Sequence, residues 1–307
     1  MKKRVDITLI IVSMILLVVI ADLAAGCNTS QPTSQTRLPP NAPSSAIPTT
    51  PTTTPPSAGT NVGSNNSDNY YQPCCQETVT RLRSLTGNLK IPDHLLKYSP
   101  SNSDNSTHPV KQGGEFDPNL YLEVLTHLKL QNGFVLDYVY DLNSLGGAPL
   151  LYARPVDQEP YLTSKDFYAA QPAHFLSRIV VDDSPEGFLQ FAILDVMGPQ
   201  FYLFWHANYN YKEVLCGSDD IEQVISENAK SNFGSPLNSK QIWQARAIAD
   251  PSPRVEIKAE EVSVSLLMFT YWGGFYRRTY TIKRAFPHDI LDVQDKNLVP
   301  FNCGFMF

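Results

Sequence analysis

Two residues in the C-terminal half of the chain could act together in acid–base chemistry. His206 shares a predicted strand face with Tyr202, and Asp195 is the only charge in the preceding apolar segment, 188–197. An imidazole held by a carboxylate can act as a general base, so this pair predicts a hydrolase if the two side chains meet. In a structural interpretation, Asp195 only caps the turn that follows it, and His206 satisfies a hydrogen bond in the core.

A second group of residues favours binding rather than catalysis. Trp272, Tyr276 and Arg277 surround a predicted hairpin tip and combine flat apolar rings with a guanidinium group. This combination suits stacking on a sugar or holding a carboxylate. The alternative is an ordinary ladder of aromatic side chains across two strands. The candidate binding residues are Tyr202, His206, Trp272, Tyr276 and Arg277.

The sequence lacks the common signatures of catalysis and of phosphate or dinucleotide binding. It contains no His-Glu-x-x-His, Gly-x-x-x-x-Gly-Lys, Gly-x-Gly-x-x-Gly or Gly-x-Ser-x-Gly. Asp289, Asp292 and Asp295 are three residues apart, so a helix there would gather them on one face, where they could bind calcium or remain solvated. We assign no catalytic residue, no metal site and no cofactor.

The spacing of apolar residues predicts the elements that must position these side chains. Three helices are expected, at 73–86, 118–132 and 219–230. Strands are expected at 134–142, 149–154, 174–181, 188–197, 201–209, 262–272 and 275–284. In the last hairpin, a three-residue loop at 273–275 opposes Met268 to Tyr280. The predicted fold is α+β, an antiparallel β-meander with helices packed against it.

The first 27 residues indicate where the chain is sent. Three cationic residues precede an apolar run at 7–21, and small residues lead to Cys27, which is the layout of a secretory signal. The Ala-Ala-Gly-Cys ending resembles the lipobox of bacterial lipoproteins. The resemblance implies that Cys27 is lipidated and anchors the chain to the membrane. An uncleaved signal-anchor and plain secretion are the alternatives, and all three place the rest of the chain outside the cytoplasm.

Composition divides the chain into three parts. After the signal peptide (1–26), Cys27 begins a linker (27–70) rich in Pro, Thr, Ser and Asn. A segment of this kind buries too little apolar surface to fold, so we expect a disordered tether. Residues 71–307 are expected to form a single extracytoplasmic domain. Without the signal, Lys plus Arg falls from 24 to 21 and Asp plus Glu from 30 to 28, a net charge of −7. Such an acidic chain is a poor partner for nucleic acid.

The remaining cysteines form an even set in a compartment that permits disulfides. Adjacent cysteines rarely bond to each other, so one arrangement ties Cys74 and Cys75 separately to Cys216 and Cys303. Reduced, buried cysteines are the alternative. A four-thiolate metal site is disfavoured because no Cys-x-x-Cys pair supplies the usual ligand spacing.

These observations favour a membrane-anchored extracytoplasmic lipoprotein with a non-catalytic binding module. Its partner would be a glycan, a small solute or another envelope protein. An envelope hydrolase using His206 and Asp195 and a purely structural envelope protein are the two alternatives.

Overall fold

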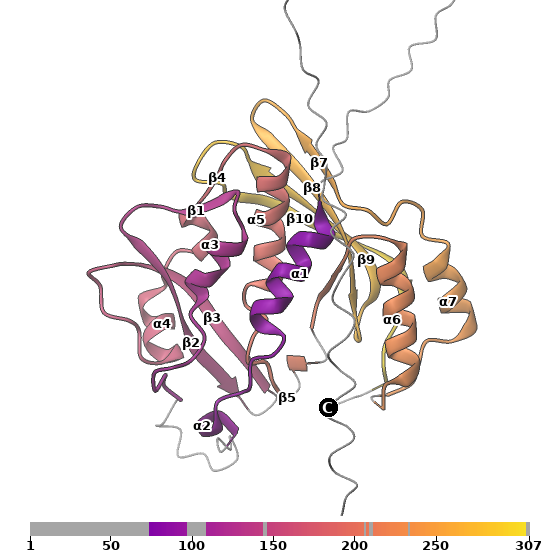
Figure 1. The fold of residues 1–307 in the computed structure, drawn as a ribbon, viewed down its shortest axis with the longest axis horizontal. Helices are drawn as coiled ribbons and strands as arrows, with labels where there is room; N and C mark the ends of the chain where they lie inside the picture. The colour runs from indigo at the N-terminus through magenta and orange to yellow at the C-terminus, as the bar shows by residue number, and fades with distance from the viewer. Residues whose placement is uncertain are drawn as a thin grey trace, which may run out of the picture. The chain divides into compact units, whose positions relative to one another are not determined.

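A computed structural model describes residues 74–96, 109–143, 146–205, 207–208, 211–232 and 234–304. All of these residues belong to one unit, Asn66–Phe307. The predicted signal peptide, Cys27, the predicted linker and His206 lie outside the described residues. The unit combines helices with antiparallel sheets, so the predicted α+β class is confirmed (Figure 1).

The largest sheet has five antiparallel strands and is organised around β8 (Glu261–Thr270). One edge of β8 pairs with β9 (Gly274–Lys283), which in turn pairs with β10 (Ile290–Pro300). The other edge of β8 pairs with β7 (Arg254–Ile257) and, further along, with β6 (Glu213–Leu215). Strands β8, β9 and β10 therefore form an antiparallel meander. The sequence predicted strands for β8 and β9 but none at 290–300, so the third strand of this meander was missed.

The predicted register of the β8–β9 hairpin is wrong and so is the predicted position of its loop, although the loop length of three residues is confirmed. The loop is 271–273, and Met268 lies opposite Tyr276 instead of Tyr280. Gly274 explains the position of the turn: its φ is +80°, and a Cβ there would collide with the backbone oxygen of Val299. The shift of four residues keeps like faces together, which is why face matching could not detect it.

Two smaller groups of strands complete the β-structure. The predicted hairpin of β2 (Phe134–Asn143) and β3 (Gly146–Pro155) is confirmed, and β3 also pairs with the short β5 (Phe204–Trp205). A separate pair joins β1 (Leu128–Leu130) to β4 (Ile179–Val181).

The predicted strand at 188–197 is wrong, because this segment belongs to the helix α5 (Pro185–Met197). Ser184 caps the helix by accepting a hydrogen bond from Gly187 N at 3.0 Å, and Pro185 occupies its first turn. In the predicted order of strands, these residues would instead form the turn between the strands at 174–181 and 188–197. Burial on nearly every side removes the amphipathic period that normally identifies a helix.

The other helices surround the sheets. Two predicted helices are confirmed, α1 (Cys75–Thr86) and α6 (Ser218–Lys230). The predicted helix at 118–132 is wrong beyond Val124, because the chain there enters strand β1. The helix that would have gathered Asp292 and Asp295 is also wrong, since both lie in β10. The remaining helical elements are α2 (Asp93–Leu96), η2 (Pro118–Leu120), α3 (Tyr121–Val124), α4 (Ser164–Ala170), η3 (Phe175–Arg178) and α7 (Ser239–Arg246).

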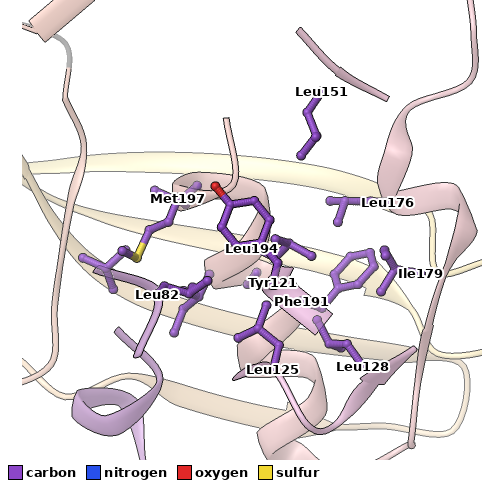
Figure 2. Close-up of a cluster of buried hydrophobic side chains, with 14 of the residues drawn as sticks. Leu82, Tyr121, Leu125, Leu128, Leu151, Leu176, Ile179, Phe191, Leu194 and Met197 are labelled. Carbon is purple, nitrogen blue, oxygen red and sulfur yellow. The ribbon is translucent and has the colours of Figure 1, made fainter. Parts of the chain in front are cut away.

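Apolar side chains gather on both faces of the large sheet. The larger cluster is centred on α5, where Phe191 and Leu194 pack with Tyr121 and Leu125 (Figure 2). The Tyr121 hydroxyl donates a hydrogen bond to Gly198 O at 2.8 Å, so this buried polar group is satisfied. A smaller cluster lies on the opposite face and combines residues of α6 and α7 with the ends of β8, β9 and β10.

A disulfide ties the first helix to the middle of the unit. Cys75 of α1 bonds to Cys216, 141 residues later in the sequence. Cys303 is a buried free thiol, so the predicted bond to Cys303 is wrong. Cys74 is not a free thiol. The reduced alternative therefore does not hold for the Cys75–Cys216 pair.

Candidate functional site

A cavity of about 610 Å³ lies between α7 and the strands β7 to β10. Its volume falls within the ~300–1,000 Å³ typical of small-molecule sites. We call it the Trp243 pocket. Its wall comes from α7 and the following turn, and its floor comes from the four strands. The lining residues are Trp243, Gln244, Ala247, Ile248, Ala249, Arg254, Glu256, Ser263, Ser265, Arg277, Lys296 and Leu298.

The short helix α7 holds Trp243 beside the sheet. A capping box begins the helix: Asn238 accepts from Gln241 N, and the Gln241 side chain accepts from Asn238 N, each at 2.9 Å. Gln241 also donates to the backbone oxygen of Pro300 at 2.8 Å, which ties α7 to β10. Trp243 nevertheless remains 69% exposed. An indole fixed in this way and left open to water is available to a ligand.

The floor of the pocket is polar because the side chains on the pocket side of β8 are polar in its first half and apolar in its second half. In its first half, Val262 and Val264 are buried while Ser263 and Ser265 are only half-buried. The serines therefore face the pocket, opposite the core face of the strand. In its second half, Leu267 and Phe269 on the pocket side are buried in the cluster that includes α6 and α7. The pocket lies beside the first half of β8, which the apolar cluster of α6 and α7 does not cover.

Asp250, four residues after the end of α7, holds the two arginines of the pocket. Its carboxylate accepts from Arg254 Nε at 2.6 Å, and its backbone oxygen accepts from Arg277 at 2.6 Å. The residue has a φ of 48°, a conformation that Asp adopts more readily than most side chains. One turn residue therefore fixes both guanidinium groups.

The pocket carries an excess of positive charge on the meander strands. Arg277 of β9 and Lys296 of β10 lie directly opposite each other in the sheet. Like charges in this position destabilise a sheet by up to about 1 kcal/mol. Burial lowers the pKa of Arg277, and Arg254 lowers it further, whereas Asp250 opposes them. The guanidinium stays protonated at neutral pH, because an arginine titrates far above that range. Its hydrogen bond goes to the backbone oxygen of Asp250, and the Asp250 carboxylate also interacts electrostatically with its charge. Glu256 adds a second carboxylate to the lining, beside the positive charges of Arg254, Arg277 and Lys296.

Comparison with protein-family models, curated proteins and solved structures finds no match to this chain.

The structure brings one of the predicted binding residues into the pocket. Arg277 lines it. Trp272 lies in the β8–β9 loop and packs against the smaller apolar cluster. Tyr276 is buried, with the Arg278 guanidinium 5.8 Å from its ring centre. Tyr202 is also buried, and its hydroxyl accepts from Phe116 N at 3.0 Å. Tyr202 and Tyr276 therefore have core packing roles.

Asp195 lies on α5 rather than on a strand, and it accepts a hydrogen bond from the Tyr280 hydroxyl at 2.8 Å. Surrounding protein lowers the pKa of His174, and Asp195 opposes this shift. The same carboxylate opposes the burial that lowers the pKa of Lys212. The described partners of Asp195 are thus residues that the sequence analysis did not pair with it, while its pairing with His206 stays a prediction.

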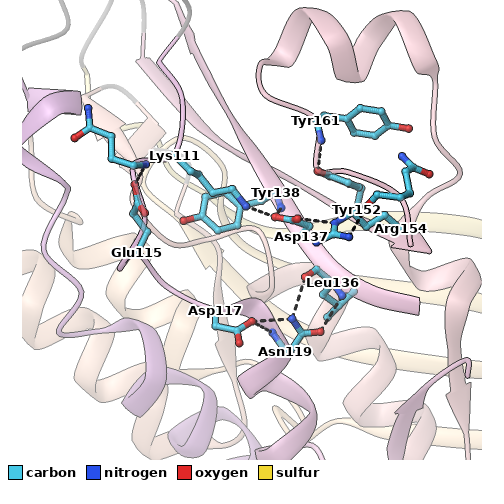
Figure 3. Close-up of polar contacts among 12 residues, drawn as sticks. Lys111, Glu115, Asp117, Asn119, Leu136, Asp137, Tyr138, Tyr152, Arg154 and Tyr161 are labelled. Carbon is cyan, nitrogen blue, oxygen red and sulfur yellow. Dashed lines mark hydrogen bonds and ion pairs between the residues drawn. The ribbon is translucent and has the colours of Figure 1, made fainter. Parts of the chain in front are cut away.

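A buried ion cluster on the β2–β3 hairpin has the features of a structural group (Figure 3). Asp137 accepts from Arg154 Nε at 2.8 Å and from Tyr138 N at 2.8 Å, and it forms an ion pair with Lys111. Burial would raise the pKa of Asp137, but hydrogen bonds from Lys111 and Arg154 bring it below its usual value. Both carboxylate oxygens already accept hydrogen bonds within the protein, so Asp137 is poorly available to a ligand.

Neither a metal-binding cluster nor a membrane-spanning helix occurs among the described residues. In residues 74–304, apart from the gaps given above, no three His, Cys, Asp or Glu side chains gather closely enough to hold a metal ion. Within the same residues, no helix has the length and apolarity needed to cross a membrane.

Trp243 is the residue that sequence reasoning missed. The segment 239–246 is short and polar, and its apolar period is weak. Two signals could have identified it: the Asn238–Gln241 capping pair, and a tryptophan beside an isoleucine in a short segment that is mostly polar.

Proposed function

We propose that this chain is a membrane-anchored extracytoplasmic lipoprotein whose folded part is a non-catalytic binding module. Its ligand site is the Trp243 pocket, and its ligand is an anionic saccharide. The observation that carries the proposal is the direct opposition of Arg277 and Lys296, which a negatively charged ligand would relieve.

The other lining groups suit a sugar. The apolar C–H face of a pyranose ring can cover the exposed indole of Trp243, which removes both surfaces from water. Ser263 and Ser265 supply hydroxyls that can donate to and accept from sugar hydroxyls. A carboxylate on the sugar would take two parallel hydrogen bonds from the Arg277 guanidinium.

The anchor part of the proposal rests on the N-terminal pattern. Cys27 is expected to carry the lipid, and the linker to hold the module away from the membrane. Metabolic labelling with a palmitate analogue tests this part by itself. Label should enter the wild-type chain and be absent from a Cys27→Ala variant. Label in both chains would disprove the assignment.

Thermal unfolding of the full-length protein in detergent tests the ligand. An oligogalacturonate is compared with its methyl ester, in which esterification removes the negative charges and keeps the sugar rings. At a hundredfold excess over Kd, binding to the native state adds about 2.7 kcal/mol, or about 5–10 °C in Tm for a domain of this size. An equal shift in Tm with both ligands would show that the charges of Arg277 and Lys296 do not contribute to binding. No shift with any acidic saccharide would move the assignment to a protein partner or a structural role.

A further inference from the structure

The edge strand β10 offers a second surface, which shares Lys296 with the Trp243 pocket. Among the described strands it pairs with β9 alone, and residues 291–297 are all exposed. Such an edge presents unpaired backbone N–H and C=O groups to any strand of compatible shape.

The edge is regular only in its middle. Irregularities in register interrupt β10 between Ile290 and Asp292 and again between Asn297 and Val299. Bulges of this kind limit pairing at the two ends of an edge strand. They leave 292–297 as the segment able to extend the sheet. Lys296 lies within it, and a lysine there opposes pairing with most strands.

We infer that this segment pairs with the same segment of a second copy of the chain, antiparallel about a two-fold axis at Gln294. Directly opposed residues in an antiparallel pair point their backbone groups either both toward the partner strand or both away from it. Neighbouring residues of one strand differ in this orientation, so a symmetric register has to centre on a residue. Centring on Asp292 or Asp295 would oppose two carboxylates, and centring on Lys296 would oppose two ammonium groups. Centring on Val293 pairs no opposite charges.

A register centred on Gln294 places opposite charges of the two β10 strands across from each other. In that register Asp292 of each copy lies opposite Lys296 of the other, which gives two cross-strand ion pairs on one face of the sheet. Asp292 and Lys296 do share a face, because both positions are even-numbered on a regular strand. On the other face, Val293 lies diagonal to Val293 of the second copy near the axis, and it is 42% exposed in the single chain. Lys296, which disfavours pairing with most other strands, therefore favours pairing with this segment of a second copy.

Cysteine crosslinking in membranes that carry the full-length chain tests the inference. Gln294→Cys places the two introduced thiols opposite each other, so an interchain disulfide should form under mild oxidation. Lys165→Cys, at an exposed position on α4, serves as the matched control. Crosslinking of Gln294→Cys no faster than this control would overturn the pairing.

Charge reversal tests the register. In the Gln294→Cys chain, Asp292→Lys opposes two lysines at each pair and should slow crosslinking about tenfold, while adding Lys296→Asp should restore the original rate. Crosslinking that is fast in all three chains would overturn the Gln294 register. Asp292 does not line the Trp243 pocket, so its substitution alone leaves the saccharide site intact. Matched thermal melts establish that each variant is folded.

Discussion

Replacing Trp243 by Ala is the sharpest test of the saccharide site. The residue is 69% exposed, so about 170 Å² of a ~250 Å² side chain is open to a ligand. If a sugar ring covers half of that area, about 85 Å² of apolar surface leaves water. At ~25 cal/mol per Å² this contributes about 2 kcal/mol, or about thirtyfold in affinity.

The same change should cost little stability. The buried remainder of Trp243, about 80 Å², is worth about 2 kcal/mol, and the higher helix propensity of Ala returns about 0.5 kcal/mol. The variant should therefore stay folded while its Kd for the oligogalacturonate rises about thirtyfold.

Isothermal titration calorimetry of the wild type and the variant measures the affinities. Leu162→Ala is the control, because Leu162 is equally exposed, at 68%, and lies outside the pocket. It should bind the oligogalacturonate like the wild type. If Trp243→Ala also binds like the wild type, no sugar stacks on the indole, and the reasoning that placed the ligand there fails.

Three further predictions concern charge and stability. Arg277→Gln should weaken calorimetric binding of the acidic saccharide about tenfold or more while Lys165→Gln leaves it unchanged; equal losses would contradict the site. Cys75→Ser should lower the free energy of unfolding in urea by up to about 5 kcal/mol, because the bond to Cys216 closes a loop of 141 residues. The lowered pKa of Asp137 gives stability present above about pH 4 and lost as pH falls through the folded-state pKa. Asp137→Asn should therefore cost about 3 kcal/mol in urea at pH 7 and less at pH 3; a pH-independent cost would refute this.

Sequence periodicity predicted the elements that bury one face. The α1 and α6 helices each have an apolar stripe and a polar face, and the β2–β3 hairpin has strong strand propensity. The same reasoning failed for α5, where burial on nearly all sides leaves no period to detect. The start of α5 was nevertheless indicated by Ser184 and Pro185. These residue types begin helices as often as they form turns between strands.

The candidate site was predicted only in part. Arg277 was identified because its guanidinium group lies close in sequence to the aromatic residues of a predicted hairpin tip. Trp243 was missed because the pocket exists only where α7 docks on the sheet, a tertiary contact with no local signature. Tyr202 and Tyr276 were placed in a binding surface because aromatic side chains in cores and in binding sites have the same composition, and only burial separates them.

The double burial of β8 has a consequence for how the molecule opens. Leu266 and Met268 belong to the larger apolar cluster, while Leu267 and Phe269 belong to the smaller one, and all four side chains are at most 1% exposed. Neither cluster can come apart without exposing the strand that both share. Amide hydrogens at 266–269 should therefore exchange with solvent only through global unfolding, and should mark the slowest-exchanging segment of the unit.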